Sequence, residues 1–141
     1  MAGVLFPLVR PLAYCLSPEQ AHGMSLQMLR MGGANPLGRS ILGAMFGLAD
    51  SDPVEFLGLQ FANRVGLAAG YDKDALGWRG LCQLGFGHIE IGTVTPRPQP
   101  GNPGPRVFRL KQDRAIINRL GFPSRGAAFV RDQLEGARVN E

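Results

Sequence analysis

One stretch near the middle of the chain, Asn63–Asp74, most constrains the fold. It reads NRVGLAAGYDKD, and its apolar part, Val65–Ala68, predicts a short buried strand. Gly70 then lets the backbone pass close to a flat or phosphorylated ligand. Asp72 and Lys73 stand where the strand ends. In a parallel α/β protein, ligand-binding loops lie at this carboxyl edge of the sheet, so we expect a binding site here.

The same arrangement recurs further along the chain. His88–Ile91 predicts a second strand, which ends at Thr93, and a Pro-rich loop, Val94–Pro105, follows it. Between the two strands, a helix is predicted from about Ala75 to Leu84, with Gly85 as its stop. Strand, helix and strand at this spacing indicate a parallel βαβ unit, so two successive strand ends offer polar groups to one face.

The first third of the chain has a different character. Val4–Leu16 is apolar on nearly every side and is interrupted by two prolines, which predicts a short kinked helix. Arg39–Leu48 predicts a short amphipathic helix that leads into a polar link, Ala49–Pro53. We place a domain boundary in this link, with residues 1–49 as a small helical unit and residues 50–141 as the α/β part.

Between these two helices, the sequence carries a strong helix start. Ser17 can cap the helix, Gln20 completes a capping box, and the helix should run to about Met31 before Gly32 and Gly33. Its apolar residues form a stripe at helical spacing, consisting of Ala21, Met24, Met28 and Met31. On periodicity alone, this stripe favours packing in a core.

The remaining elements decide the fold class. Val54–Phe61 predicts a hairpin, Arg106–Leu110 and Ile116–Asn118 predict strands, and Ser124 opens a final helix over about Arg125–Arg138. A closed (β/α)8 barrel needs eight strands and typically ~250 residues. We therefore expect an α/β fold that is the opening part of a TIM barrel, preceded by a small membrane-associating helical unit.

Composition excludes several function classes. The chain has 15 Lys and Arg against 11 Asp and Glu, but the basic residues are scattered, which argues against nucleic-acid binding. Cys15 and Cys82 lie far apart, so we expect no metal site and a reducing, intracellular setting. No stretch approaches ~20 apolar residues, and no clear secretory signal or transit peptide precedes the fold. A membrane surface is the more plausible acidic partner.

Three long motifs resemble one family. They read GLAAGYDKD, LGFGHIEIGTVTPRPQPGNPGPRVFRL and INRLGF, and they are similar to the signature stretches of the quinone-dependent, class 2 dihydroorotate dehydrogenases. The resemblance implies oxidation of dihydroorotate to orotate with FMN and a membrane quinone in pyrimidine synthesis. It also implies that the N-terminal helices rest peripherally on the cytoplasmic side of the cell membrane, as in bacterial members. There the methionine stripe would help to form a quinone tunnel, because thioethers adapt to a greasy tail.

The resemblance also implies residue roles. The FMN-binding residues would be Ala68, Ala69, Gly70, Tyr71, Asp72 and Thr93. Dihydroorotate or orotate would be bound by Lys73, Asn118, Arg119, Leu120, Gly121 and Phe122. The quinone head group would be bound by His22 and Arg109. We expect the catalytic serine base to lie beyond Glu141, so that the 141-residue chain alone is inactive.

Each of these residues has a plainer interpretation when it is taken alone. The Ala69–Gly70 pair could be a tight turn, Lys73 a solvated lysine, His22 a solvated helix histidine and Arg109 a surface arginine. An ammonium at Lys73 can instead pair with a substrate carboxylate, and the Asn118 amide can both donate to and accept from a pyrimidine imide edge.

Two departures from the family pattern leave alternatives open. Tyr71 stands where the family usually has Phe or Leu, and Pro123 stands where many members have Asn. One alternative is another FMN-dependent TIM-barrel pyrimidine oxidoreductase with a soluble acceptor, although His22 and Arg109 argue against it. A second alternative is a non-catalytic membrane-binding fragment.

Overall fold

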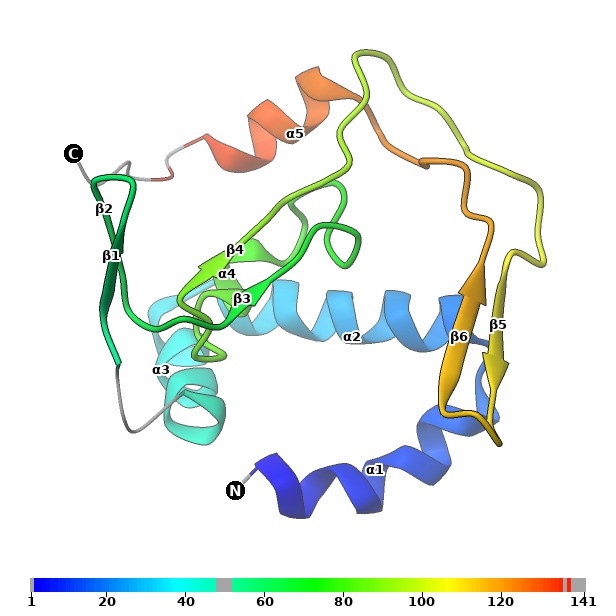
Figure 1. Ribbon diagram of the computed structural model, residues 1–141, viewed down its shortest axis with the longest axis horizontal. Helices are drawn as coiled ribbons and strands as arrows, with labels where there is room; N and C mark the ends of the chain where they lie inside the picture. The colour runs from blue at the N-terminus through cyan, green and yellow to red at the C-terminus, as the bar shows by residue number, and fades with distance from the viewer. Residues whose placement is uncertain (1, 48–51, 136, 138–141) are drawn as a thin grey trace.

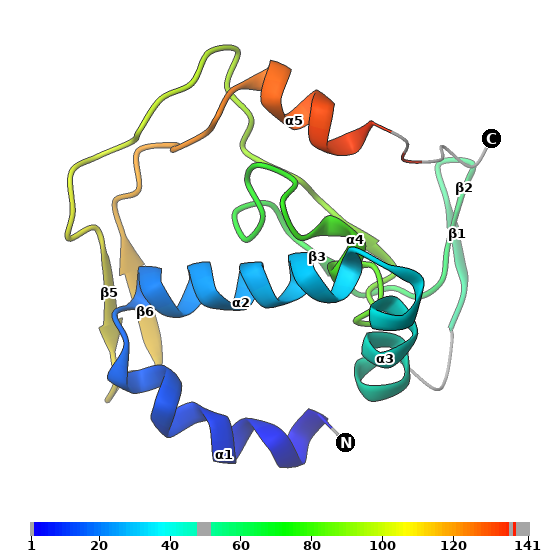
Figure 2. The same ribbon diagram turned by 180° about the vertical axis from the view of Figure 1, so that it is seen from behind.

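The computed structural model describes residues 2–47, 52–135 and 137, and Figure 1 shows their arrangement. Helix α2 crosses the middle of the molecule, with helix α1 on one side of it and helix α5 on the other, as the reverse view in Figure 2 also shows. In chain order, the elements are α1 (Ala2–Cys15), α2 (Pro18–Gly33), α3 (Pro36–Phe46), β1 (Val54–Phe56), β2 (Leu59–Phe61), β3 (Gly66–Leu67), α4 (Trp78–Leu81), β4 (His88–Ile89), β5 (Val107–Leu110), β6 (Ala115–Asn118) and α5 (Ala127–Leu134).

Strands β3 and β4 pair in parallel, with Gly66 opposite His88, which confirms the predicted parallel unit. Hydrogen bonds extend the pairing beyond the strands, since the Gly70 amide donates to the Gly92 carbonyl at 2.8 Å. A Cβ at position 66 would collide with the His88 ring, so a larger residue there would force the exposed His88 side chain to move. Val65 was expected to be buried, but it is 61% exposed because only one neighbouring strand covers this part of the described structure.

Two antiparallel hairpins lie at opposite ends of the molecule (Figure 1). In the first, β1 and β2 are joined at Leu57 and Gly58, which have φ values of 52° and 76°. Positive φ at both positions is typical of a two-residue hairpin turn, and the hairpin predicted around Gly58 is confirmed. The second hairpin pairs β5 with β6, with Arg109 opposite Ile116.

The predicted start of α2 is confirmed in detail. The Gln20 amide donates to Ser17 Oγ at 3.2 Å, and the Ser17 amide donates to Gln20 Oε1 at 3.0 Å, which completes the capping box. The helix ends at Gly33, two residues past Met31 and within the glycine pair that was predicted to stop it. Gly33 lies against α4 so closely that a Cβ on it would stand 2.4 Å from the Gly80 nitrogen, and an added side chain would therefore break the contact.

Three predicted helices have different bounds in the structure. Helix α3 begins earlier, at Pro36, because Asn35 Oδ1 accepts a hydrogen bond from the Gly38 amide at 2.8 Å and caps it. Helix α4 is reduced to one turn, since the residues before it form a loop tied to Asp72. Helix α5 begins at Ala127, after the predicted cap Ser124. The predicted ends at Leu48 and Arg138, and most of the predicted link, lie outside the described residues.

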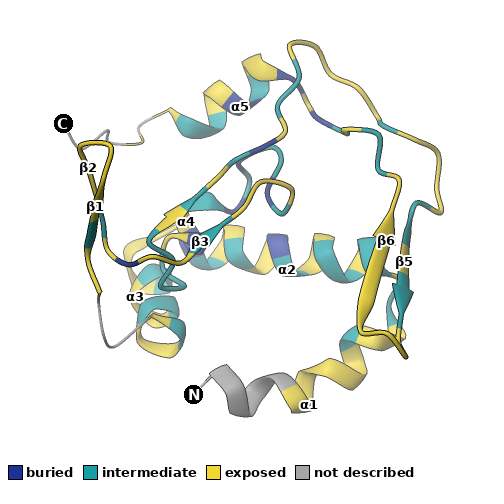
Figure 3. Cartoon of the chain, viewed as in Figure 1, coloured by how far each residue is buried: buried dark blue, intermediate teal, exposed yellow. Residues whose placement is uncertain are grey.

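The methionine stripe of α2 faces outward. Met24, Met28 and Met31 are 47%, 61% and 65% exposed, so the expectation that they pack in a core is wrong for this structure. The helix instead buries Leu26. In Figure 3, most of α2 is coloured as exposed or intermediate, with a buried section near its middle. A Cβ at Gly77, the residue before α4, would stand 2.9 Å from Leu26 Cδ1, so the approach of α2 to the start of α4 depends on a small residue there.

Candidate functional site

A tight loop follows β3 and organises the site. Asp72 is only 1% exposed, and its carboxylate accepts hydrogen bonds from the amides of Leu76 and Gly77 at 2.8 and 2.7 Å. A buried carboxylate satisfied by backbone donors holds a loop firmly. Asp72 therefore shapes the loop, and its side chain is not free to contact a ligand.

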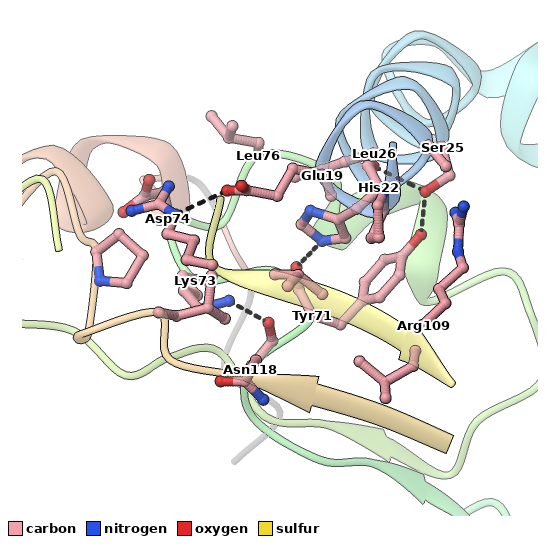
Figure 4. Close-up of a pocket in the computed structure, with 18 residues that line it drawn as sticks. Glu19, His22, Ser25, Leu26, Tyr71, Lys73, Asp74, Leu76, Arg109 and Asn118 are labelled. Carbon is pink, nitrogen blue, oxygen red and sulfur yellow. Dashed lines mark hydrogen bonds and ion pairs between the residues drawn. The ribbon is translucent and has the colours of Figure 1, made fainter. Parts of the chain in front are cut away.

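Lys73, the next residue, is half-buried and borders the cavity drawn in Figure 4. Its Nζ donates to the Gly70 carbonyl, as Figure 4 shows. Burial lowers the pKa of Lys73 below its usual value; the Asp74 carboxylate opposes this shift, and the Arg106 guanidinium adds to it. The ammonium is thus held partly out of water next to a backbone carbonyl, where it is available to an anionic group.

Lys73 lies in the wall between two cavities. The first has a volume of about 570 Å³ and is bordered by α2, the loop after β3 and the β5–β6 hairpin. The second has a volume of about 460 Å³ and is bordered by the strand ends and the segment after β6. Both cavities are lined by Gly70, Lys73, Asn118 and Leu120.

In the first cavity, α2 meets the loop after β3 through polar contacts (Figure 4). His22 Nε2 lies 2.6 Å from the Tyr71 carbonyl oxygen, and the two rings meet edge to face, with centroids 5.0 Å apart. Ser25 Oγ lies 2.8 Å from the Tyr71 hydroxyl. These contacts join residues far apart in the sequence and place the His22 ring in the cavity wall.

Two arginines join the N-terminal helices to β5 and to the residue before it. Arg109 in β5 donates to the carbonyls of Leu16 and Ala13 at 2.7 and 3.3 Å, and its guanidinium lies 4.9 Å from the centre of the Tyr14 ring. Arg106, just before β5, forms an ion pair with Glu19 of α2 at 2.8 Å. Arg109 therefore satisfies carbonyls near the end of α1 while it lines the first cavity.

The Pro-rich loop holds the segment that lines the second cavity. Asn102 Nδ2 donates to the Arg119 carbonyl at 2.7 Å, and the Asn102 amide donates to the Leu120 carbonyl at 2.9 Å. Gln99 Nε2 donates to the Phe122 carbonyl at 2.8 Å. The loop is thus an ordered part of the site, and its side chains fix the backbone of 119–122.

The sequence profile of the family described as Dihydroorotate dehydrogenase matches residues 53–141. The chain belongs to this family. It is 53% identical over 130 residues to "Dihydroorotate dehydrogenase (quinone)" of Acidithiobacillus ferrooxidans and 51% identical over 140 residues to the protein of that name in Roseiflexus sp.. These alignments cover 92% and 97% of the chain, but only 36% and 38% of the two relatives, so the chain spans little more than a third of their length.

The fold comparison agrees with the family assignment. A crystal structure of DHODH from Eimeria tenella in complex with ferulenol matches with a TM-score of 0.71 and 44% identity. The match covers 84% of this chain and 30% of that one. The α/β arrangement described above therefore has the dihydroorotate dehydrogenase fold over the part that the chain spans.

For this member of the family, the predicted site residues fall into groups around the two cavities. His22, Tyr71 and Arg109 line the first cavity only. The second cavity alone is lined by Ala69, Thr93, Arg119, Gly121 and Phe122. Ala68 and Asp72 are not among the lining residues of either cavity. Three sets of residues that are distant in the sequence are thus brought to one region.

Sequence reasoning missed Glu19, Ser25, Asn102 and Arg106. A signal for two of them was present, because Glu19, His22 and Ser25 follow one another at spacings of three along one helix face. Asn102 and Arg106 gave no such signal, since their partners come from other segments. Across residues 2–47, 52–135 and 137, no group of His, Cys, Asp and Glu side chains is placed to hold a metal ion.

Proposed function

We propose that this chain forms the cofactor-facing and acceptor-facing part of a quinone-dependent dihydroorotate dehydrogenase. One observation carries the proposal: two cavities meet at a shared wall made of Gly70, Lys73, Asn118 and Leu120. A flavin enzyme of this kind must receive electrons from one molecule and deliver them to another. Adjacent cavities with a common wall suit two such half-reactions.

FMN and the pyrimidine would bind in and beside the second cavity. The site fits a flat ring, because Gly70 borders both cavities and no atom lies within 4 Å of the point where its Cβ would stand. Bound there, FMN would supply the redox chemistry, as the hydride acceptor for dihydroorotate and the electron donor for the quinone. The chain's own residues would supply position and charge, with Ala69 and Thr93 along the flavin and the backbone of Ala68 and Tyr71 beside them, while the buried Asp72 carboxylate would hold the loop in place.

Lys73 and Asn118 would bind the pyrimidine. The Lys73 ammonium can pair with the substrate carboxylate, and it stands next to the space proposed for the flavin ring, where it would stabilise negative charge. The Asn118 amide can both donate to and accept from the imide edge. The backbone of Arg119–Phe122, held by the Pro-rich loop, would complete this side of the site.

The quinone head group would enter the first cavity, against His22 and Arg109. Leu8 and Leu12 of α1 and the three methionines of α2 are exposed apolar side chains that could rest on the cytoplasmic side of the cell membrane. Within the part of the chain that the structure describes, no helix is long and apolar enough to cross a membrane. Through these exposed apolar side chains the helices would lie at the membrane surface, and residues 1–49 would act as a peripheral, quinone-guiding unit.

The test uses a completed enzyme, in which residues 1–141 are joined to the remaining part of the Acidithiobacillus ferrooxidans relative. The parent protein should oxidise dihydroorotate with a quinone acceptor. Lys73→Ala should lower kcat/KM for dihydroorotate at least tenfold, because a charge-assisted hydrogen bond contributes roughly 1.5–3 kcal/mol.

The control for this test is Lys111→Ala, which removes the other lysine of the chain at an exposed position in the β5–β6 turn. Its kcat/KM should stay within about twofold of the parent value, as expected for a surface residue away from the site. Equal effects of the two substitutions would exclude Lys73 from the substrate site. A parent protein that binds FMN but fails to oxidise dihydroorotate would overturn the proposed function itself.

A further inference from the structure

Tyr71 and one turn of α2 are joined by hydrogen bonds in both directions (Figure 4). The Tyr71 hydroxyl pairs with Ser25 Oγ at 2.8 Å, and the Tyr71 carbonyl pairs with His22 Nε2 at 2.6 Å. Ser25 Oγ also donates to the His22 carbonyl at 2.8 Å. All three residues are half-buried, and all three line the first cavity.

The direction of each bond follows from the number of protons available. Ser25 has one hydroxyl proton, and the His22 carbonyl, which can only accept, takes it. The Tyr71 hydroxyl must therefore be the donor in its bond to Ser25 Oγ. The Tyr71 carbonyl can likewise only accept, so His22 Nε2 carries a proton. Together the three bonds fix the place of the turn and keep the His22 Nε2 proton directed at the Tyr71 carbonyl.

We propose that Tyr71 is a positioning residue that holds His22 in the acceptor cavity through this reciprocal clamp, defined as Tyr71, Ser25 and His22. The inference rests on the proposed function, since it assigns the first cavity to the quinone. The Tyr71 hydroxyl locks the turn of α2, and the Tyr71 carbonyl locks the ring.

The hydroxyl is the part of Tyr71 that requires explanation. The edge-to-face contact with His22, with an interplanar angle of 89°, would be kept by a phenylalanine, and so would the carbonyl contact. Only the bond to Ser25 would be lost, which would leave a half-buried serine oxygen without its donor. The tyrosine at this position and the serine three residues after His22 therefore act as a pair.

The clamp predicts a defect that is confined to one half-reaction. Tyr71→Phe and Ser25→Ala should each raise KM for a long-tailed quinone about fivefold in the completed enzyme, the size of effect expected for one ordinary hydrogen bond. Reduction of FMN by dihydroorotate, followed by stopped flow, should stay within about twofold of the parent. The double variant should be no worse than Ser25→Ala alone, because Ser25→Ala already breaks the bond that Tyr71→Phe removes.

Ser40→Ala, at an exposed position of α3, is the matched control for loss of a serine hydroxyl and should leave both half-reactions unchanged. Three outcomes would overturn the clamp. Additive effects in the double variant would mean that Tyr71 and Ser25 have independent roles, and equal losses in both half-reactions would mean a general role in stability. An unchanged KM for quinone would mean that the bond has no role in the acceptor reaction.

A readout without turnover separates this inference from the proposed function. With 15N-labelled histidine, NMR of the parent should show His22 as a single Nε2–H tautomer. Tyr71→Phe should shift it toward a mixture, because the turn that carries the ring is then held less firmly against the Tyr71 carbonyl. A parent that shows the fixed tautomer but no dihydroorotate oxidation would retain the clamp and overturn the proposed function. An unchanged His22 spectrum in Tyr71→Phe would overturn the clamp, whatever the enzyme activity.

Discussion

The two faces of helix α2 use opposite kinds of residue. The face toward α4 carries Leu26, Leu29 and Gly33 and is close-packed against glycines of the facing segment. A Cβ at Gly80 would collide with the Leu29 carbonyl oxygen, and a Cβ at Gly77 would press on Leu26. The face toward the first cavity carries polar side chains, Glu19, His22 and Ser25, each of which contacts a distant segment. One helix thus serves as a structural support on one side and as a cavity wall on the other.

The difference between the two faces of α2 shows how the N-terminal helices are joined to the α/β part. The backbone contact with α4 determines where α2 lies, and a few polar bonds then determine how the cavity wall is arranged. Changes on the packed face should therefore reduce stability and affect every activity. Changes on the cavity face should affect the acceptor reaction alone.

The largest expected effect is on the packed face. Gly80→Ala should lower the free energy of unfolding of the completed enzyme by about 3 kcal/mol, because the new methyl group meets backbone that cannot move aside alone. Urea unfolding followed by circular dichroism measures this. Gly23→Ala, in α2, is the control: nothing lies within 4 Å of its added Cβ, and it should gain about 0.5–1 kcal/mol from helix propensity. Similar stabilities for the two variants would contradict the close contact.

The next effect is on the cavity face. His22→Ala should lower kcat/KM for a long-tailed quinone about tenfold, because the ring and its hydrogen bond to Tyr71 are both lost. The free energy of unfolding should fall by less than about 1 kcal/mol, since the ring is only half-buried. Parallel quinone kinetics and urea unfolding test the pair of expectations. If His22→Ala lowered the free energy of unfolding as much as Gly80→Ala, the packed face and the cavity face of α2 would not differ in their roles.

A pH effect is expected from Lys73, which lies in the cavity wall opposite α2. Burial lowers its pKa, so the ammonium loses its proton at a lower pH than an ordinary lysine would. Since the charged form is the one that pairs with a carboxylate, kcat/KM for dihydroorotate should fall as pH rises through this lowered pKa. Lys73→Arg should remove that alkaline fall, because arginine stays charged. An alkaline fall that is the same in both proteins would assign it to another group.

The smallest effect concerns the ion pair between Glu19 and Arg106. Their side chains are 40% and 21% exposed, and water screens the attraction, so Glu19→Gln should cost no more than about 1 kcal/mol of stability. The cost should shrink as salt is added. Urea unfolding at low and high NaCl concentrations measures both expectations. A cost that is independent of salt would indicate that the pair acts through packing rather than charge.

Much of the local structure was predictable because its causes are local. The capping box at Ser17 and Gln20, the turn at Leu57 and Gly58, and the parallel strands around Gly66 and His88 all follow from nearest-neighbour chemistry or from short repeats. The lengths of α4 and α5 were wrong for a physical reason. Asp72 and Ser124 bind nearby backbone amides in loops, and that interaction competes with helix formation at the expected starts.

The sequence by itself determined the family, the parallel strand pair and the residues placed at the strand ends, because these depend on motifs and on spacing along the chain. Only the tertiary structure decided that the methionines of α2 face outward and that the Asp72 carboxylate accepts hydrogen bonds from the amides of its own loop. It also decided that Tyr71 contacts the turn containing His22 and Ser25. The two members of the Tyr71–Ser25 pair are 46 residues apart, and those of the Arg106–Glu19 pair 87. Helical periodicity shows which residues share a face, but which face meets a partner depends on side chains and backbone brought in from distant segments.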